Sequence, residues 1–225
     1  MLQRGNVVSS RDSGTMLAGA GLLCPCTGFA TGCRRPRAPD REIDYPMALH
    51  TTFPLVDEVL DSFASALGND RLAYRNHLYR MLNYASELFG QASSLPDSVL
   101  IAAAFHDLGL WTDRTLDYLE PSAKLAGNYL QQHHLTALEA EVRAMIFEHH
   151  KLRLYRGEFA GTVEVFRRAD LVDVSLGWVR FGLPAAYVRS VKQALPNAGF
   201  HARLAQLTLR QSLRSPLRPL PMLRW

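Results

Sequence analysis

Helical spacing of apolar residues is the feature that most restricts how this chain can fold. From Phe53 to about residue 213, apolar side chains recur every three or four positions, the spacing that places them on one face of an α-helix. Glycine, proline and polar residues interrupt this pattern and mark helix ends. We therefore predict an all-α fold, a single compact helical domain, with helices over about 53–67, 70–88, 97–106, 121–130, 135–151, 163–174, 185–195 and 200–213.

The two ends of the chain lack this spacing. Residues 1–46 are rich in Gly, Arg, Pro, Ser and Thr, so we predict a disordered N-terminal extension, or a segment upstream of a true start at Met47. A weak secretory or lipoprotein signal is the alternative, because Arg4 and Arg11 precede the mildly apolar segment Met16–Leu23 and the later Ala30–Cys33 (ATGC) resembles a lipidation site. Residues 47–225 then form the domain, which ends in an extended basic tail from Pro216.

Composition indicates the cellular setting. The chain has 225 residues and is 48% hydrophobic, which is enough for one sizeable core. No apolar run approaches the roughly 18 residues of a transmembrane helix, so we expect no membrane span. All three cysteines lie within the first 33 residues, which leaves the domain without a disulfide framework and favours a cytoplasmic location.

Charge is distributed unevenly along the domain. Met47 to Asp173 holds 17 acidic residues against 11 Lys and Arg, whereas Val174 to Trp225 holds 8 Lys and Arg and no acid. A basic segment can meet phosphates, nucleic acid or an anionic membrane surface, but on amphipathic helices it is more often a solvated face or a complement to an acidic region. We therefore expect a small-molecule ligand rather than nucleic acid, and association into a homo-oligomer stays open.

One apolar run ends in an imidazole and a carboxylate. Ile101 to Phe105 is followed by His106, Asp107, Leu108 and Gly109. A buried carboxylate is costly unless it is paired, hydrogen-bonded or bound to a cation, and a metal ion is the simplest partner. Because successive helical residues point about 100° apart, both side chains reach one ion only at a helix end. We expect Gly109 to end this helix in a left-handed conformation.

Two further residues suit a metal site. His77 lies beside the apolar stripe of the 70–88 helix, and Asp170 lies inside a nearly wholly apolar stretch, where an unpaired carboxylate is expensive. A lone histidine such as His77 is more often a satisfied core residue than a ligand. Together with His106 and Asp107, however, these residues place four ligand-competent side chains on three separate helices.

The segments around these residues carry a family resemblance. They are Tyr74–Arg80 (YRNHLYR), Ala103–Gly109 (AAFHDLG) and Arg168–Asp173 (RADLVD). From about residue 48 to residue 213 the chain resembles the HD-domain superfamily, whose metal-dependent phosphohydrolases carry His, His-Asp and Asp along an all-α domain. The resemblance implies that His77, His106, Asp107 and Asp170 bind the metal.

The donor types define the expected chemistry. Imidazole and carboxylate ligands together suit a divalent ion such as Mn, Fe, Co, Ni or Zn. An ion with open positions polarises a phosphoryl oxygen and lowers the pKa of a bound water. The resemblance therefore implies a metal-dependent hydrolase of a small phosphate ester, with a nucleotide as the expected substrate. Asp107 would sit beside the attacking water, and Glu148 and Asp173 are the carboxylates available to position or deprotonate it.

Some HD proteins hold two ions through extra ligands between the His-Asp pair and the last Asp. By resemblance, His149 occupies one of these positions. The other falls just before the 121–130 helix, where such families have a histidine and this chain has Glu120. One ion or two are therefore open, with Glu120 and His149 as the additional candidate ligands.

The chain departs from the family where the phosphate would bind. Many HD hydrolases have a lysine shortly after the His-Asp pair, whereas Leu110 and Trp111 occupy that region here. We therefore expect substrate contacts from Trp111 and from four basic residues, namely Arg114, Lys151, Arg153 and Arg167. The Gly-Tyr-Pro signature of the cyclic-dinucleotide branch is absent, so cyclic di-GMP is not an expected substrate.

Two alternatives to phosphate hydrolysis remain. One keeps the fold and metal but is an HD-type lyase, hydratase or di-iron oxygenase acting on a small non-phosphate substrate, which Trp111 and the missing lysine favour. The other is a non-enzymatic regulatory domain with a structural metal, which binds its partner through the basic residues Arg210, Arg214 and Arg218.

Overall fold

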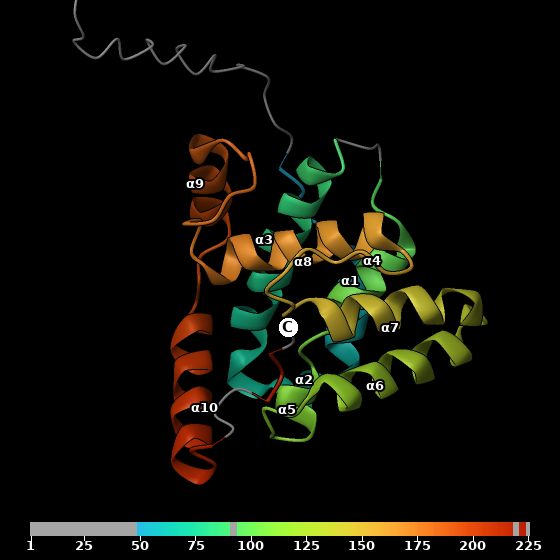
Figure 1. The fold of residues 1–225 in the computed structure, drawn as a ribbon, viewed down its shortest axis with the longest axis vertical. Helices are drawn as coiled ribbons and strands as arrows, with labels where there is room; N and C mark the ends of the chain where they lie inside the picture. Colours follow the sequence, from blue (N-terminus) through green and yellow to red (C-terminus); the bar gives the residue numbers. More distant parts are fainter. Residues whose placement is uncertain (1–48, 91–93, 218–220, 224–225) are drawn as a thin grey trace, which may run out of the picture. The chain divides into compact units, whose positions relative to one another are not determined.

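The computed structural model describes residues 49–90, 94–217 and 221–223 of the chain. These residues belong to one unit, Tyr45–Trp225, and every regular element in them is a helix, which confirms the all-α prediction (Figure 1). The expectations for residues 1–46 lie outside the described residues. Among the helices that are described, none is both long and apolar enough to cross a membrane.

The helices follow the predicted spacing closely. In chain order they are α1 (Pro54–Ser62), α2 (Ala64–Leu67), η1 (Gly68–Asp70), α3 (Arg71–Leu88), α4 (Asp97–Phe105), α5 (Gly109–Thr112), α6 (Leu119–Gln132), η2 (Thr136–Leu138), α7 (Glu139–Glu148), α8 (Ala160–Val174), α9 (Ala185–Ala194) and α10 (Phe200–Arg214), where η marks a short 3-10 helix.

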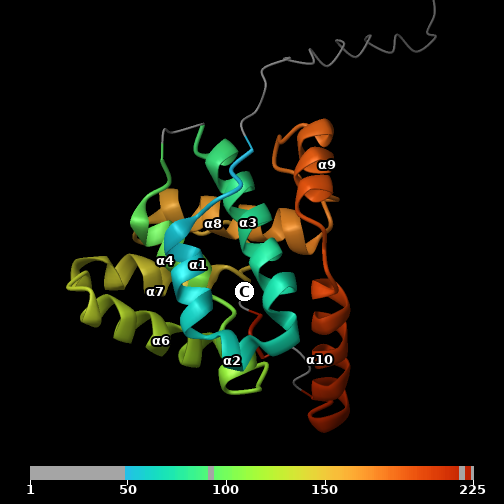
Figure 2. The same ribbon diagram turned by 180° about the vertical axis from the view of Figure 1, so that it is seen from behind.

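Helices α3 and α4 form the centre of the fold. Thirteen of the eighteen residues of α3 and seven of the nine residues of α4 are buried, as expected for helices covered on all sides. Helix α8 crosses α3 on one side, α1 packs against both α3 and α4, and α9 packs against α3 (Figures 1 and 2). Five polar residues of α3 are therefore held inside the core, namely Asn76, His77, Arg80, Asn83 and Ser86.

Helices α6 and α7 form a hairpin beside this centre (Figure 1). The chain reverses around His134, whose φ of 58° is in the left-handed region. Helix α7 also packs against α4 and α8. This packing brings the C-terminal ends of α4 and α7 together with the middle portions of α3 and α8.

The segment after His106-Asp107 differs from the prediction. The predicted helices end at residue 106 and resume at residue 121, whereas Gly109–Thr112 form the short helix α5. Gly109 is not among the glycines with positive φ. The expectation of a left-handed Gly109 is therefore wrong. Glycine is required for space, because a Cβ at this position would lie 2.7 Å from the carbonyl oxygen of Tyr118 and 3.1 Å from Oγ of Ser122.

Candidate metal centre

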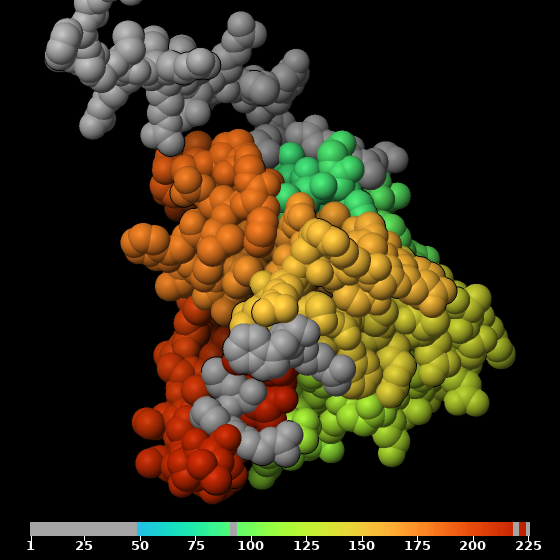
Figure 3. Space-filling model, viewed as in Figure 1, coloured from blue at the N-terminus to red at the C-terminus, as the bar shows by residue number. Residues whose placement is uncertain are grey.

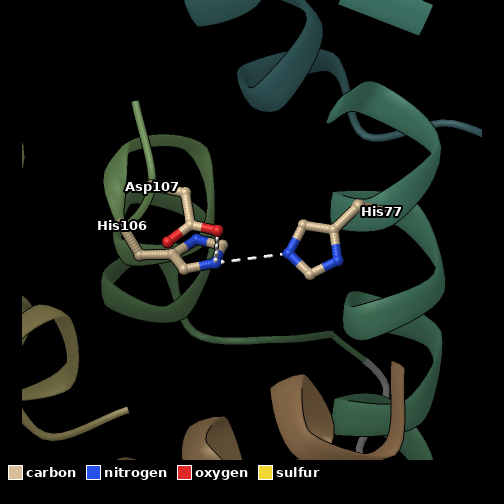
Figure 4. Close-up of side chains that lie close together, drawn as sticks. All are labelled: His77, His106 and Asp107. Atoms are coloured by element: carbon tan, nitrogen blue, oxygen red, sulfur yellow. Dashed lines mark hydrogen bonds and ion pairs between the residues drawn. The ribbon is translucent and has the colours of Figure 1, made fainter. Parts of the chain in front are cut away.

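Four buried side chains meet where α3, α4 and α8 converge. His77 lies in the middle of α3, His106 caps the C-terminus of α4, Asp107 follows it, and Asp170 lies on α8. None is more than 5% exposed. Figure 4 shows the ring of His77 facing His106 and Asp107, with the two Nε2 atoms 3.3 Å apart. Oδ1 of Asp170 lies 3.6 Å from Nε2 of His77 and 3.9 Å from Nε2 of His106.

The end of α4 explains how adjacent residues reach one point. Helix α4 ends at Phe105, and His106 to Leu108 form a turn before α5. Oδ2 of Asp107 therefore lies 3.4 Å from Nε2 of His106, although neighbouring side chains diverge by about 100° in a regular helix. The predicted helix end is confirmed.

Hydrogen bonds assign the tautomers of three histidines. Nδ1 of His77 is 2.8 Å from a carboxylate oxygen of Asp173, Nδ1 of His106 is 2.8 Å from the carbonyl oxygen of Ala103, and Nδ1 of His149 is 2.7 Å from that of Ile146. Because these oxygens are acceptors, each Nδ1 carries the proton in the neutral ring. Each Nε2 is then an unprotonated acceptor directed into the cluster.

The inward-facing atoms fit a divalent cation. Unprotonated Nε2 atoms and carboxylate oxygens are all acceptors, so they cannot hydrogen-bond to one another. Oδ1 of Asp107 and Nε2 of His149 are buried and have no hydrogen-bond partner, which is costly without a compensating cation. Metal-binding histidines characteristically donate their other ring N–H to a carboxylate or a backbone carbonyl, as all three do here. The cluster is therefore a candidate metal site.

Burial and neighbouring charges set the protonation of the cluster. Burial lowers the pKa of His106 to about 3, which keeps the ring neutral, as a ligand must be. Burial opposes ionisation of Asp107, but the electrostatic interactions of its carboxylate with the adjacent imidazoles of His106 and His149 outweigh burial and hold the pKa of Asp107 well below its usual range. Burial raises the pKa of Asp170 to about 6. A bound cation would favour the ionised form of both carboxylates.

A second group of potential ligands adjoins the first. Asp107, His149 and His150 each offer a donor atom within 4.8 Å of the others, and Nε2 of His149 lies 3.5 Å from Oδ1 of Asp107. Asp107 thus faces both groups. His150 was not predicted as a ligand, because it would point away from His149 on a continuous helix. Helix α7 ends at Glu148, however, so both histidines lie in a turn.

The structure does not bring Glu120 into the cluster. Its carboxylate accepts hydrogen bonds from Arg143 at 2.9 and 3.0 Å on the exposed surface of the α6–α7 hairpin. The residue before α6 that reaches the site is Tyr118, which is buried and whose hydroxyl lies 2.5 Å from Nε2 of His150. Sequence reasoning missed Tyr118, since it considered only charged and imidazole ligands at this position.

Asp173 lies behind His77 rather than beside a water site. One of its carboxylate oxygens faces Nδ1 of His77, and both oxygens accept hydrogen bonds from the buried guanidinium of Arg80. Burial raises the pKa of Asp173, but the hydrogen bonds from Arg80 and His77 outweigh this effect and lower the pKa to about 2. Both carboxylate oxygens of Asp173 are therefore engaged by His77 and Arg80, and its catalytic role stays a prediction. Arg80, which was not predicted, lies one helical turn after His77.

Glu148 and Lys151 flank His149 and His150 along the chain. Nζ of Lys151 is 3.3 Å from a carboxylate oxygen of Glu148, and both side chains are largely buried. Glu148 is the last residue of α7, immediately before His149. Of the two carboxylates predicted to position or deprotonate the water, Glu148 and Asp173, Glu148 is therefore the one that adjoins His149 in the sequence.

The other predicted substrate contacts are dispersed. Arg114 and Arg153 are exposed on separate loops. Arg167 is buried and donates to Glu164 and to the carbonyl oxygen of Lys151. Trp111 is buried against Tyr74, with ring centroids 4.6 Å apart, and its Nε1 donates to Asp70. Arg167 and Trp111 therefore have structural partners.

Aromatic rings enclose the histidines. The ring of Phe200 stacks on His77 with centroids 4.2 Å apart and planes 12° from parallel. The ring of Phe166 meets His106 edge to face at 5.7 Å. These contacts fix the imidazole orientations and lower the dielectric constant around the donor atoms.

Comparisons with known proteins supply no further assignment. No family model, no curated protein and no solved structure matches the chain. The chain forms a helical domain with a buried His and Asp cluster whose donor atoms lie within metal-binding distance of one another.

Proposed function

We propose that the protein is a metal-dependent phosphohydrolase of the HD type that acts on a small phosphate ester, with a nucleotide as the expected substrate. One observation carries this proposal: the Nε2 atoms of His77, His106 and His149 converge with the carboxylates of Asp107 and Asp170 in the buried core. The order of these residues along an all-α chain is the order of ligands in HD phosphohydrolases.

The first ion would be held by His77, His106, Asp107 and Asp170. Two neutral imidazoles and two carboxylates balance the charge of a divalent ion, and this donor set suits Mn, Fe, Co, Ni or Zn. When bound, such an ion supplies Lewis-acid polarisation of a phosphoryl oxygen and a water of lowered pKa. Asp173 and Arg80 hold the ring of His77 in the tautomer that this role requires.

A second ion would share Asp107 with the first. His149 and His150 supply imidazole donors on the other side of this carboxylate. The hydroxyl of Tyr118 hydrogen-bonds to Nε2 of His150 and fixes the orientation of the His150 ring. We therefore propose His150 in place of Glu120 as the additional ligand beside His149, and Asp107 as the carboxylate common to both ions.

Substrate would enter from the side of the α7–α8 loop and the loop before α6. Glu148 is the carboxylate that we propose for accepting a proton from the attacking water, because it directly precedes His149 at the end of α7. Lys151, Arg153 and Arg114 are the proposed phosphate contacts from these loops. Arg167 is excluded from this role, since its guanidinium donates to Glu164 and to the backbone.

One observation favours a second candidate, an HD-type lyase, hydratase or di-iron oxygenase. The two buried arginines nearest in sequence to the cluster residues have carboxylate partners, Arg80 with Asp173 and Arg167 with Glu164. The cluster is also enclosed by aromatic rings. A small substrate without phosphate would suit this environment better than a phosphate dianion.

The experiment that separates these functions is a substrate screen on protein loaded with each of the five metals. We expect hydrolysis of p-nitrophenyl phosphate or of a nucleoside monophosphate, and its loss when His106→Gln is combined with Asp107→Asn. Hydrolysis that survives this double substitution would refute the phosphohydrolase. Iron-loaded protein that hydrolyses no ester and shows a mixed-valence paramagnetic signal would instead support the oxygenase.

A further inference from the structure

Large apolar side chains are exposed mainly near the C-terminal end of the domain. Among the described residues, six of the nine exposed large apolar side chains lie after residue 174. We use the name C-terminal surface for these six residues together with two neighbouring arginines of α10, namely Leu176, Trp178, Val179, Leu209, Arg210, Leu213, Arg214 and Leu217.

Helix α10 has two faces of different character. Leu204 and Leu207 face the body of the protein and pack against its core. On the exposed side, Ala202, Ala205, Leu209 and Leu213 fall within an arc of about 80° at 100° per residue. Leu209 is 61% exposed and Leu213 is 77% exposed. The outward face of α10 is therefore an apolar stripe without an internal partner among the described residues.

Arginines flank this stripe along one side. Arg210 and Arg214 each follow a leucine of the stripe by one position, so they lie about 100° around the helix from Leu209 and Leu213. Both arginines are exposed. Apolar residues beside arginines that can extend to headgroups are typical of helices that lie in a membrane interface.

Trp178 extends the apolar surface beyond α10. It lies in the turn between α8 and α9 and is 88% exposed. Hydrogen bonds hold this turn: Nζ of Lys192 donates to the carbonyl oxygen of Leu176, and the backbone N–H of Val179 donates to Oγ of Ser175. Figure 3 shows the segments of α8–α9 and α10 along one edge of the molecule. An ordered turn thus presents an exposed indole ring in the segment that precedes α9.

Charge identifies the kind of partner. From Val174 to Trp225 the sequence has eight Lys and Arg and no acid. Symmetric pairing of two copies through α10 would bring arginines against arginines without any nearby carboxylate from this segment. An anionic surface, in contrast, neutralises the arginines while its apolar layer accepts the leucines and the indole ring.

We propose that the C-terminal surface docks the protein on an anionic lipid membrane. Leu209, Leu213 and Trp178 enter the boundary between headgroups and acyl chains, and Arg210 and Arg214 contact lipid phosphates. The stripe on α10 is a helix face and not a concave groove, which suits a fluid bilayer better than a rigid protein partner. The docked state is peripheral and does not depend on the proposed enzymatic function.

Vesicle co-sedimentation of the full chain tests this proposal. We expect binding to vesicles of phosphatidylcholine with phosphatidylglycerol, weak binding to phosphatidylcholine alone, and release by salt. Arg210→Gln with Arg214→Gln should weaken binding about 30-fold, and Leu209→Gln with Leu213→Gln should weaken it about tenfold or more. The matched control is Leu152→Gln with Leu154→Gln, which makes the same change at two exposed leucines in the loop between α7 and α8 and should leave binding unchanged.

A spectroscopic measurement tests the placement of the indole ring. Brominated lipids should quench tryptophan fluorescence of the bound protein, and Trp178→Phe should remove the quenched component. The proposal is overturned if neither vesicle binds, if both bind equally, or if the Leu209 and Leu213 variant binds like the unmodified chain. It is also overturned if light scattering shows a dimer that this variant dissociates, because the surface would then join two copies.

Discussion

Replacing Asp173 with asparagine tests how the fold prepares His77 to bind a metal. The change keeps the shape of the side chain but removes the charge that faces Nδ1 of His77 at 2.8 Å. It also leaves the guanidinium of Arg80, which is 2% exposed, without its carboxylate. We therefore expect two separable effects, one on metal affinity and one on the free energy of unfolding.

The structure gives the size of each effect. Loss of a carboxylate partner behind a ligating histidine typically weakens metal binding about 10–100-fold. Loss of one partner of a buried ion pair costs about 3–5 kcal/mol in the free energy of unfolding. Arg80 still donates to the carbonyl oxygens of Leu195 and Pro196 at 3.0 and 3.2 Å, so we expect the lower end, about 3 kcal/mol.

The assay is a competition titration against a chromophoric chelator, together with urea unfolding of the metal-free protein. Glu164→Gln is the matched control, because Glu164 also pairs with arginines on α8 but contacts none of the candidate ligands. The control should lose stability and keep its metal affinity. If Asp173→Asn loses stability but binds metal as tightly as the unmodified chain, Asp173 does not position His77.

Three further predictions concern the surroundings of the cluster. Burial lowers the pKa of His106 from 6.5 to about 3. Between these two pH values the unfolded chain therefore binds more protons than the folded chain, so the free energy of unfolding decreases as the pH falls through that range. Urea unfolding in chelator should therefore lose stability more steeply between pH 6.5 and 4 in the unmodified chain than in His106→Asn, and equal slopes would contradict the burial argument. Glu120→Gln should change the free energy of unfolding by less than about 1 kcal/mol, since its pair with Arg143 is exposed, and a fall in metal affinity would return Glu120 to the ligand set. Gly109→Ala should lower the free energy of unfolding in urea by about 1–3 kcal/mol, because its Cβ would lie 2.7 Å from the carbonyl oxygen of Tyr118. An unchanged urea midpoint would show that the backbone at Tyr118 moves to make room for the methyl group at no cost in stability.

The helices were predictable because their apolar spacing is regular, and their ends were less so. The run before His106 indicated correctly that α4 ends there. Adjacent side chains can also meet at the end of α7. The apolar spacing, however, predicted a helix that continues to Lys151, in which His150 would point away from His149. The structure ends α7 at Glu148, which is why a second imidazole faces Asp107.

Partners of charged residues were the hardest feature to predict. Arg167 is paired with Glu164, three positions earlier on the same helix, and this spacing is readable in the sequence. The pairing of Asp173 with Arg80 joins α8 to α3 across 93 positions, and no local pattern indicates it. Sequence alone therefore identified His77, His106, Asp107, His149 and Asp170 as inward-facing donors, but neither His150 nor the contact between Arg80 and Asp173.

The most direct test of this account is the metal content of the purified protein. Mass spectrometry after purification without chelator and dialysis against Mn, Fe, Co, Ni or Zn should find at least one tightly bound ion per chain. His106→Gln with Asp107→Asn, shown by circular dichroism to remain helical, should lose it. A folded, unmodified chain that takes up none of these ions, or a double variant that retains as much metal, would contradict the assignment of the buried histidines and carboxylates as a metal site.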